Sequence, residues 1–178
     1  MKYIINGRKL ELIVGNITAQ DTEAVVNAAN SRLAPGGGVA GAIHREAGPG
    51  LWEECSRLGG CATGEAKLSG GHNLPNKYVI HTVGPGYSGS SSDPVLLRSC
   101  YRKSLEVAEK NNIKTISFPA LATGIFGYPV KDAAEVAFKT IIDYMKKPSN
   151  INLVRMVLYD RASYKVHAEV LKEMTGGK

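Results

Sequence analysis

Two glycine-rich segments contain the residue types that most directly suggest ligand chemistry in this sequence. The first spans residues 36–41 and the second spans residues 124–127. Glycine lets backbone N–H groups come close to a ligand, and a helix N-terminus adds unpaired donors with a partial positive charge. Two such loops at the carboxyl ends of neighbouring strands could hold a pyrophosphate. Either loop alone is as consistent with an ordinary tight turn.

Two asparagines, Asn27 and Asn30, stand ahead of the first loop and are separated by two alanines. Asparagine is a poor strand residue. Its amide donates and accepts hydrogen bonds at once, which suits the hydroxyls of a ribose. Local bonding to the loop backbone is the alternative, and we expect it for one of the two side chains.

Neither the histidines nor the cysteines are spaced as metal ligands or as a disulfide framework. These residues are His44, His72, His81, His167, Cys55, Cys61 and Cys100. His81 stands within an apolar run, which favours a buried, hydrogen-bonded ring. His44 follows the first loop by one helical turn and could face a ligand, although a structural role is more frequent. We predict no metal site, and buried free thiols in a reducing cytoplasm.

Motifs and composition exclude several functional classes. The first loop matches the GxGxxG spacing, but Pro35 precedes it and no clear strand ends in an acidic residue about 20 positions later, which argues against a Rossmann site. No P-loop and no hydrolase nucleophile elbow occur. The formal net charge of +6 suits an anionic partner, but the basic residues are scattered. No apolar run approaches the roughly 18 residues of a membrane span, and no secretory signal is evident.

The elements that must position these residues alternate along the chain. Asn6-Gly7 separates two apolar runs, which predicts an opening β-hairpin. Later strands are predicted at residues 24–27, 78–83, 115–121 and 152–159, and several of these are continuous apolar runs, which fit strands covered on both faces. Apolar residues at helical spacing predict helices at residues 93–108, 130–145 and 162–174, and one at 39–58 that is interrupted near Gly48. This alternation predicts an α/β fold with a mixed sheet, as one domain over residues 1–178.

One boundary has a specific signal, because Asp93-Pro94 precedes a helical pattern. Aspartate is a preferred N-cap, and proline is favoured in the first helical turn. We therefore expect Asp93 to cap the helix that follows it.

The ordered motifs make this chain resemble the macrodomain family. They are Gly15–Thr18, Val26–Asn30, Gly36–Ala40, His81–Pro85 and Ala122–Gly127, and Val157–Arg161 also resembles archaeal and bacterial members. Each motif is weak by itself, but the ordered set covers almost the whole chain. The resemblance implies a three-layer α/β/α sandwich with a mixed, mostly parallel central sheet. It also implies a cleft for ADP-ribose over the strand ends, with no cofactor and no metal.

The same resemblance implies which residues contact ADP-ribose. Adenine would meet Asn16 and the backbone of Ile17, and would pack on Tyr159. Asn30 would hold the distal ribose, and Phe126 would pack against it. The two loops would enclose the diphosphate and distal ribose through Gly37, Gly38, Val39, Ala40, Ala122, Thr123, Gly124, Ile125 and Phe126. Asn30, Gly38 and Phe126 are the residues expected to assist catalysis.

Two positions depart from the family pattern. Asn16 stands where the family usually has an aspartate that accepts a hydrogen bond from the adenine amino group. The carbonyl of Asn16 can still accept, but without charge assistance. Ala40 stands where the hydrolytic MacroD-like branch has an aspartate, so the obvious carboxylate for positioning water is missing.

Two functions follow as alternatives from this resemblance. The favoured one is an enzyme that hydrolyses bonds at C1″ of the distal ribose, in ADP-ribosylated protein, ADP-ribose-1″-phosphate or O-acetyl-ADP-ribose. The other is a non-catalytic reader of ADP-ribose, which Ala40 favours. A weaker third is a module for RNA or poly-ADP-ribose, motivated by the net charge. We expect a cytoplasmic monomer with no membrane partner.

Overall fold

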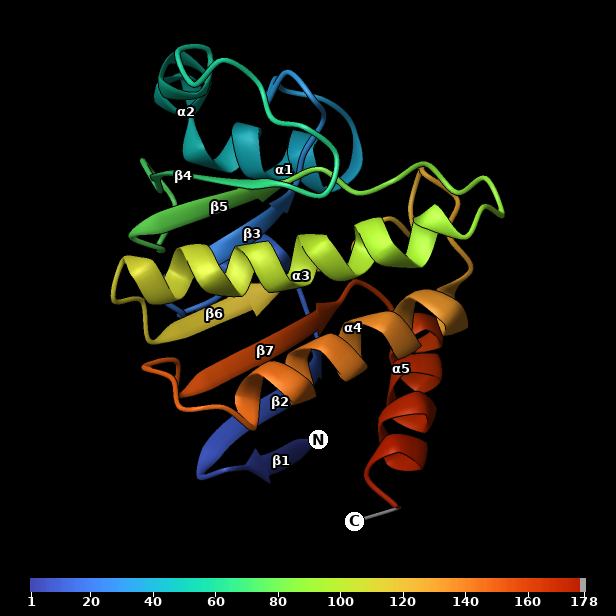
Figure 1. Ribbon diagram of the computed structural model, residues 1–178. Helices are drawn as coiled ribbons and strands as arrows, with labels where there is room; N and C mark the ends of the chain where they lie inside the picture. The colour runs from blue at the N-terminus through green and yellow to red at the C-terminus, as the bar shows by residue number, and fades with distance from the viewer. Residues whose placement is uncertain (177–178) are drawn as a thin grey trace.

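A seven-stranded sheet runs through residues 1–176, the part of the chain that this computed structural model describes (Figure 1). The strand order is β1-β2-β7-β6-β3-β5-β4. The strands are β1 (Lys2–Ile5), β2 (Arg8–Val14), β3 (Ala24–Ala28), β4 (Ala66–Gly70), β5 (Tyr78–Thr82), β6 (Thr115–Phe118) and β7 (Leu153–Leu158). The inner pairings, from β2 through β7, β6 and β3 to β5, are parallel, and the two outer pairings are antiparallel. The predicted mixed, mostly parallel sheet is confirmed.

Helices cover both faces of this sheet. They are α1 (Gly38–Ala47), α2 (Pro49–Cys55), α3 (Ser92–Lys110), α4 (Val130–Met145) and α5 (Arg161–Met174). Apolar residues of α3, α4 and α5 form one core with one face of the sheet. Those of α1 and α2 form a second core, which includes Val25 and Val79 of the central strands. Two cores on opposite faces make the three-layer α/β/α sandwich that the resemblance implied. No helix in the described part of the chain is long and apolar enough to cross a membrane.

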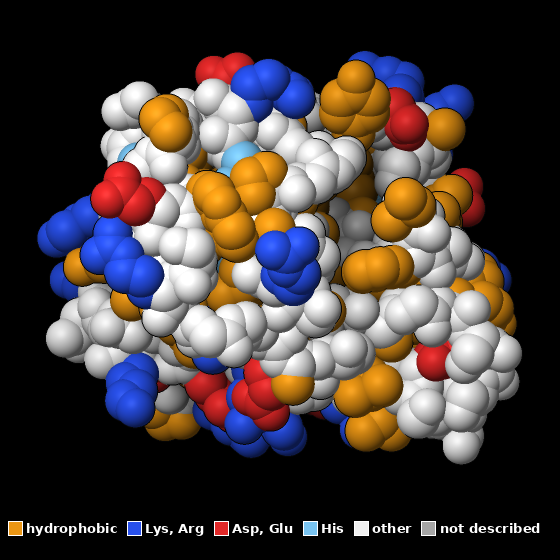
Figure 2. All heavy atoms as spheres, turned by 90° about the horizontal axis from the view of Figure 1, so that it is seen from above, with side chains coloured by type: hydrophobic (Ala, Val, Ile, Leu, Met, Phe, Trp, Pro, Cys, Tyr) orange, Lys and Arg blue, Asp and Glu red, His pale blue; other side chains and the backbone are white. Residues whose placement is uncertain are grey.

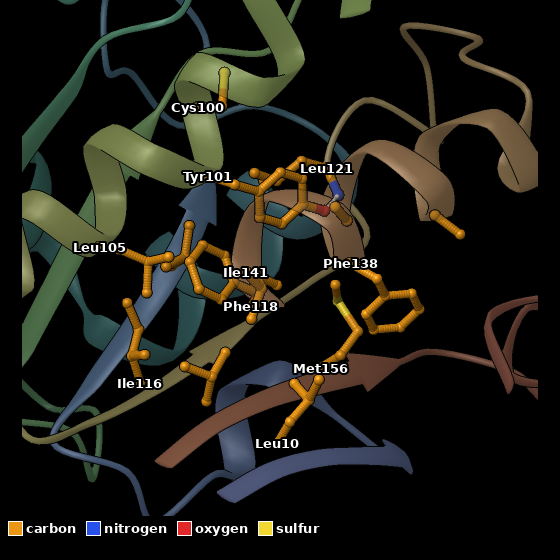
Figure 3. Close-up of a cluster of buried hydrophobic side chains, with 14 of the residues drawn as sticks. Leu10, Cys100, Tyr101, Leu105, Ile116, Phe118, Leu121, Phe138, Ile141 and Met156 are labelled. Atoms are coloured by element: carbon orange, nitrogen blue, oxygen red, sulfur yellow. Dashed lines mark hydrogen bonds between the residues drawn. The ribbon is translucent and has the colours of Figure 1, made fainter. Parts of the chain in front are cut away.

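The larger core is also tied to the loop that follows β6. Tyr101 of α3 and Phe118 of β6 are fully buried, with ring centroids 5.1 Å apart. The Tyr101 hydroxyl accepts a hydrogen bond of 3.2 Å from the backbone N–H of Leu121 (Figure 3). The core therefore positions the start of the second glycine loop as well as stabilising the fold.

The structure adds two elements to the sequence-based assignment and shortens several others, β6 most clearly. β4 was not predicted, because its residues are mostly half-buried and form no apolar run. β6 ends at Phe118 rather than at Leu121, since Pro119 has no N–H to continue a ladder. The 3₁₀ helix η1 (Ile17–Ala19) was also not predicted.

Asp93 does not cap α3, contrary to the expectation from the Asp-Pro pair. The helix begins at Ser92, so Asp93 lies inside its first turn. Its carboxylate accepts hydrogen bonds of 2.9 Å from the backbone N–H groups of Ser88 and Gly89. These bonds, those from Ser88 foremost, lower the pKa of Asp93. The carboxylate thus fixes the loop before the helix instead of the helix terminus.

Candidate functional site

The predicted ligand residues converge at the carboxyl ends of the parallel strands. Asn16 follows β2, Tyr159 follows β7, and the two glycine loops follow β3 and β6. Figure 1 shows the arrowheads of β3, β6 and β7 pointing to the same side of the molecule. The backbone N–H of Gly15 donates to the carbonyl of Leu158 at 2.9 Å, which sets Asn16 beside Tyr159. Ligands of open α/β sheets bind at this edge.

Asn30 fastens the start of the first loop. Its Oδ1 accepts from the backbone N–H groups of Arg32 at 3.1 Å and Ala34 at 3.0 Å. Its Nδ2 donates to the carbonyl of Ala34 at 2.8 Å. Of the two asparagines, Asn30 is therefore the one that bonds locally. The acceptor capacity of its side chain is used, and one N–H of the amide remains for a ligand.

The N-terminus of α1 presents backbone donors without a side-chain cap. Gly37 is its N-cap residue, and the first bond within the helix runs from the N–H of Gly41 to the carbonyl of Gly37 at 3.1 Å. The N–H groups of Gly38, Val39 and Ala40 have no partner inside the helix. These donors, with the partial positive charge of the helix end, favour an anion such as a phosphate.

Close packing explains the glycine at the end of this loop. A Cβ added at Gly41 would lie 2.4 Å from the carbonyl oxygen of Gly36. Gly38 has a φ of 54°, which side-chain-bearing residues rarely adopt. The loop can therefore fold tightly back on the first turn of α1.

The second loop is a tight, internally bonded turn between β6 and α4. Tyr128 donates its backbone N–H to the carbonyl of Ala122 at 2.9 Å, and Gly127 donates to Gly124 at 3.0 Å. Ala122 itself has a φ of 67°, a left-handed conformation that costs a non-glycine residue free energy. The bonds on both sides hold it there.

The remaining side chains of the second loop divide between the solvent and the core. Thr123 donates its hydroxyl to the carbonyl of Ala120 at 2.9 Å. Ile125 is 99% exposed at the tip, whereas Phe126 is half-buried and packs against the core. The carbonyl of Phe126 accepts from the N–H of Tyr87 at 2.8 Å. The ring of Phe126 is thus held in place beside the strand ends.

Asn16 uses its side-chain acceptor to begin η1. Its Oδ1 accepts from the backbone N–H of Thr18 at 2.9 Å and from the Thr18 hydroxyl at 2.8 Å. The group that remains free is the NH₂, a donor. The expected acceptance from an adenine amino group by this carbonyl is therefore not what the geometry offers. Tyr159 is 89% exposed beside it and can stack with a base. Ile17 is buried, and η1 contacts α1.

A buried polar network lies beneath the first loop. His81 of β5 is fully buried, with Nδ1 3.1 Å from Asn27 Nδ2 and Nε2 2.8 Å from Ser69 Oγ. The Ser69 hydroxyl donates to the carbonyl of Gly70 at 3.1 Å, so it accepts from Nε2, and Nδ1 is then the acceptor for the Asn27 amide. Burial, together with the nearby His44, lowers the pKa of His81 to about 3. The prediction of a hydrogen-bonded core histidine is confirmed, and Asn27 is turned toward it.

His44 and Ala40 are both buried on α1, one helical turn apart. Neither ring nitrogen of His44 has a hydrogen-bond partner within residues 1–176, and burial lowers the pKa of this ring. The methyl group of Ala40 offers it no acceptor. The sequence indicated a structural histidine here, and the structure shows a buried one without polar partners.

Charge and metal chemistry add little to the site. On the face shown in Figure 2, Lys and Arg side chains are scattered among uncharged and acidic ones and form no continuous stripe. No group of three or more His, Cys, Asp and Glu residues within residues 1–176 could hold a metal ion. What the site offers a ligand is therefore backbone donors, amides and aromatic rings.

Comparisons with known sequences agree with this geometry. The family model described as Macro domain matches residues 26–137. A macro domain-containing protein of Methanosarcina mazei is 46% identical over 171 residues, which cover 96% of this chain and 91% of that protein. The ADP-ribose glycohydrolase MACROD2 of Homo sapiens is 42% identical over 168 residues, which cover 93% of this chain and 40% of that protein.

Solved structures show the same fold with nucleotides bound. A mutant of the Oceanobacillus iheyensis macrodomain with ADP-ribose has a TM-score of 0.96 and 38% identity, covering 99% of this chain and 98% of that one. The Trypanosoma brucei macrodomain in complex with ADP-ribose has a TM-score of 0.87 and 38% identity, covering 91% of this chain and 68% of that one. The likeness extends over the strand ends where the site lies.

Proposed function

This chain belongs to the macro domain family, and we propose that it binds ADP-ribose and hydrolyses ester bonds at C1″ of the distal ribose. The observation that carries this proposal is the pair of loops at the carboxyl ends of the neighbouring strands β3 and β6, the first of which contains the uncapped N-terminus of α1. The relatives named as ADP-ribose glycohydrolases and the related structures with bound ADP-ribose support it. The whole chain acts as one module in this proposal.

ADP-ribose would lie along the strand ends in one direction. Its adenine would rest beside Asn16 and Tyr159, which are adjacent through the last bond between β2 and β7. The diphosphate would accept from the amides of the first turn of α1. The distal ribose would lie between the free N–H of Asn30 and the ring of Phe126. Each portion of the ligand then meets a group of the matching chemistry.

The chemical step needs little acid–base assistance from side chains. Within residues 29–41 and 119–127 the one charged side chain is Arg32. A water molecule would form the bond to C1″ as the bond to the ester oxygen breaks, and the electron pair would leave with the carboxylate. The proton of the water would pass to a phosphate oxygen of the substrate. The loops would contribute orientation and electrostatic stabilisation.

This chemistry selects the linkage. A carboxylate leaving group has a pKa of about 4 and leaves as an anion without a proton donor. An amine or guanidine leaving group needs one, and neither loop supplies it. The proposed substrates are therefore acyl-linked ADP-ribose, on a protein carboxylate or as the acetyl ester, and the 1″-phosphate.

Calorimetric titration followed by a turnover assay tests the proposal. We expect ADP-ribose to bind more tightly than AMP or NAD. We also expect the protein to remove ADP-ribose from a glutamate-linked mono-ADP-ribosylated substrate over multiple turnovers. Arginine-linked ADP-ribose should remain. An absence of ADP-ribose binding would contradict the whole proposal.

The second candidate is a reader that binds ADP-ribose and does no chemistry. The observation favouring it is Ala40, which leaves the first turn of α1 without a carboxylate. Binding with no more than one product released per protein molecule would establish this alternative.

A further inference from the structure

A surface hollow of about 310 Å³ borders the second loop, between the N-terminal turns of α3 and α4. Tyr87 and Tyr128 line it, and both are bonded to the second loop. Tyr87 donates its backbone N–H to Phe126, and Tyr128 donates its own to Ala122. Ligand pockets start at about 300 Å³, so this hollow suits one side chain rather than a nucleotide. It adjoins the end of the site where the distal ribose would lie.

The walls of the hollow are aromatic and polar together. The rings of Tyr87 and Tyr128 are tilted by 57°, with centroids 5.1 Å apart. Tyr128 is 4% exposed, and its hydroxyl makes no hydrogen bond within residues 1–176. Burial, with the nearby charges of Asp93 and Asp132, raises the pKa of that hydroxyl. The hydroxyl oxygen itself is not cut off from solvent, so it is free to exchange water for a polar group of a ligand.

The charge of the hollow is opposite to that of the chain. Asp93, Asp132 and Glu135 line it, and no Lys or Arg does. The Asp93 carboxylate already accepts hydrogen bonds from the backbone N–H groups of Ser88 and Gly89, which precede α3. Asp132 and Glu135 form no ion pair with any residue in the described part of the chain. A chain with a formal net charge of +6 thus has a negative recess beside its proposed site.

We propose that this hollow binds a Lys or Arg side chain of the ADP-ribosylated protein, close to the modified residue. The cation would pack on the faces of Tyr87 and Tyr128 and donate to Asp132, Glu135 and the Tyr128 oxygen. This inference rests on the proposed function, which brings the modified residue to the second loop. It adds that the protein reads the sequence around the modification as well as the ADP-ribose.

Two modified peptides separate this inference from the proposed function. Both carry ADP-ribose on the same glutamate, and they differ by Lys or Gln at the neighbouring positions. We expect the Lys peptide to have a KM about three- to tenfold lower, with equal kcat. If the protein binds without turnover, the Kd of each peptide takes the place of KM.

Variants assign the effect to the hollow. Asp132→Asn combined with Glu135→Gln should remove the preference for the Lys peptide, and Tyr128→Phe should weaken it. Glu169→Gln, at an exposed position on α5, is the matched control and should keep it. Free ADP-ribose should bind all four proteins equally. Equal KM values for both peptides in the unmodified protein would overturn this inference alone, whereas loss of ADP-ribose binding would overturn the proposed function with it.

Discussion

Ala40 lies one helical turn before His44 on α1, and the two side chains share the buried side of that helix. The imidazole has no hydrogen-bond partner for either nitrogen within residues 1–176. A buried polar group without a partner costs free energy. A carboxylate at position 40 would offer this ring an acceptor and would stand at the first turn of α1, where the diphosphate and distal ribose meet in the proposed complex.

Ala40→Asp should therefore raise turnover of a glutamate-linked substrate by at least about tenfold, because positioned general bases contribute factors of that size and more. Single-turnover kinetics with saturating protein measures this effect. ADP-ribose affinity should change far less than the rate.

Ala40→Asn is the matched control, since it has the same shape without the charge. Ala40 is 5% exposed, so the thermal midpoint of each variant must be compared before its rate is interpreted. Equal rates for the Asp and Asn variants would contradict a role for the carboxylate as a general base.

Asn30 has two separable tasks, and two substitutions divide them. Asn30→Ala removes the three bonds that hold the first loop, and should weaken ADP-ribose binding and turnover together. Asn30→Asp keeps the acceptor for the N–H groups of Arg32 and Ala34, but it loses the donor to the Ala34 carbonyl together with the free N–H. It should disturb the loop less than Asn30→Ala does, and lose turnover by about tenfold or more. Full turnover in both variants would show that the distal ribose is held elsewhere.

Asn16→Asp should improve adenine recognition. One carboxylate oxygen can keep both bonds from Thr18, and the other replaces the NH₂ with an acceptor. Hydrogen bonds to charged groups contribute about 1.5 to 3 kcal/mol, so ADP-ribose should bind roughly tenfold more tightly. The hypoxanthine analogue, which lacks the amino group, should gain nothing in the same calorimetric titration. An equal gain for both ligands would contradict this assignment.

The stability of the protein should fall in weak acid because of His81. The pKa of an unfolded histidine is about 6.5, whereas the folded pKa of His81 is about 3. Between these two pH values the histidine binds a proton in the unfolded chain but not in the folded protein. The free energy of unfolding therefore decreases as the pH falls. At about pH 5 the loss from this residue is about 2 kcal/mol.

Urea unfolding at about pH 7.5 and about pH 5 measures this dependence. His81→Gln should be less stable at the higher pH and lose less on acidification. His44 and His167 also have pKa values lowered by burial, so part of the dependence should remain. An unchanged slope in His81→Gln would contradict the assignment to His81.

Most of the sheet could be predicted because several of its strands are short, largely apolar runs. β3, β5 and β7 are buried between helical layers, and their composition reflects that. β4 carries Lys67 and Ser69 at the sheet edge, so no such pattern marks it. The Asp93 carboxylate was misassigned because its partners, the N–H groups of Ser88 and Gly89, depend on how the preceding loop turns back.

The candidate site divides in the same way. Its two loops are recognisable from local glycine patterns, because the positive φ of Gly38 and Gly127 and the close packing at Gly41 favour glycine. The hydrogen bonds that the side chains of Asn16 and Asn30 accept depend on turns that form only in the folded chain. Tyr87 and Tyr128 carry no joint signal because they are far apart along the chain, and they meet through the second loop.

The order of the strands has a consequence for synthesis. β7 is the last strand along the chain, yet it lies between β2 and β6. Until it inserts, the strand end that carries Asn16 is not joined to the strand end that carries the second loop. A nascent chain that has been synthesised only through α4 therefore cannot bind the adenine and the distal ribose of one ADP-ribose at the same time. Only the completely folded chain therefore binds the ligand. The free energy of binding stabilises the whole fold against unfolding and does not stabilise a partly synthesised chain.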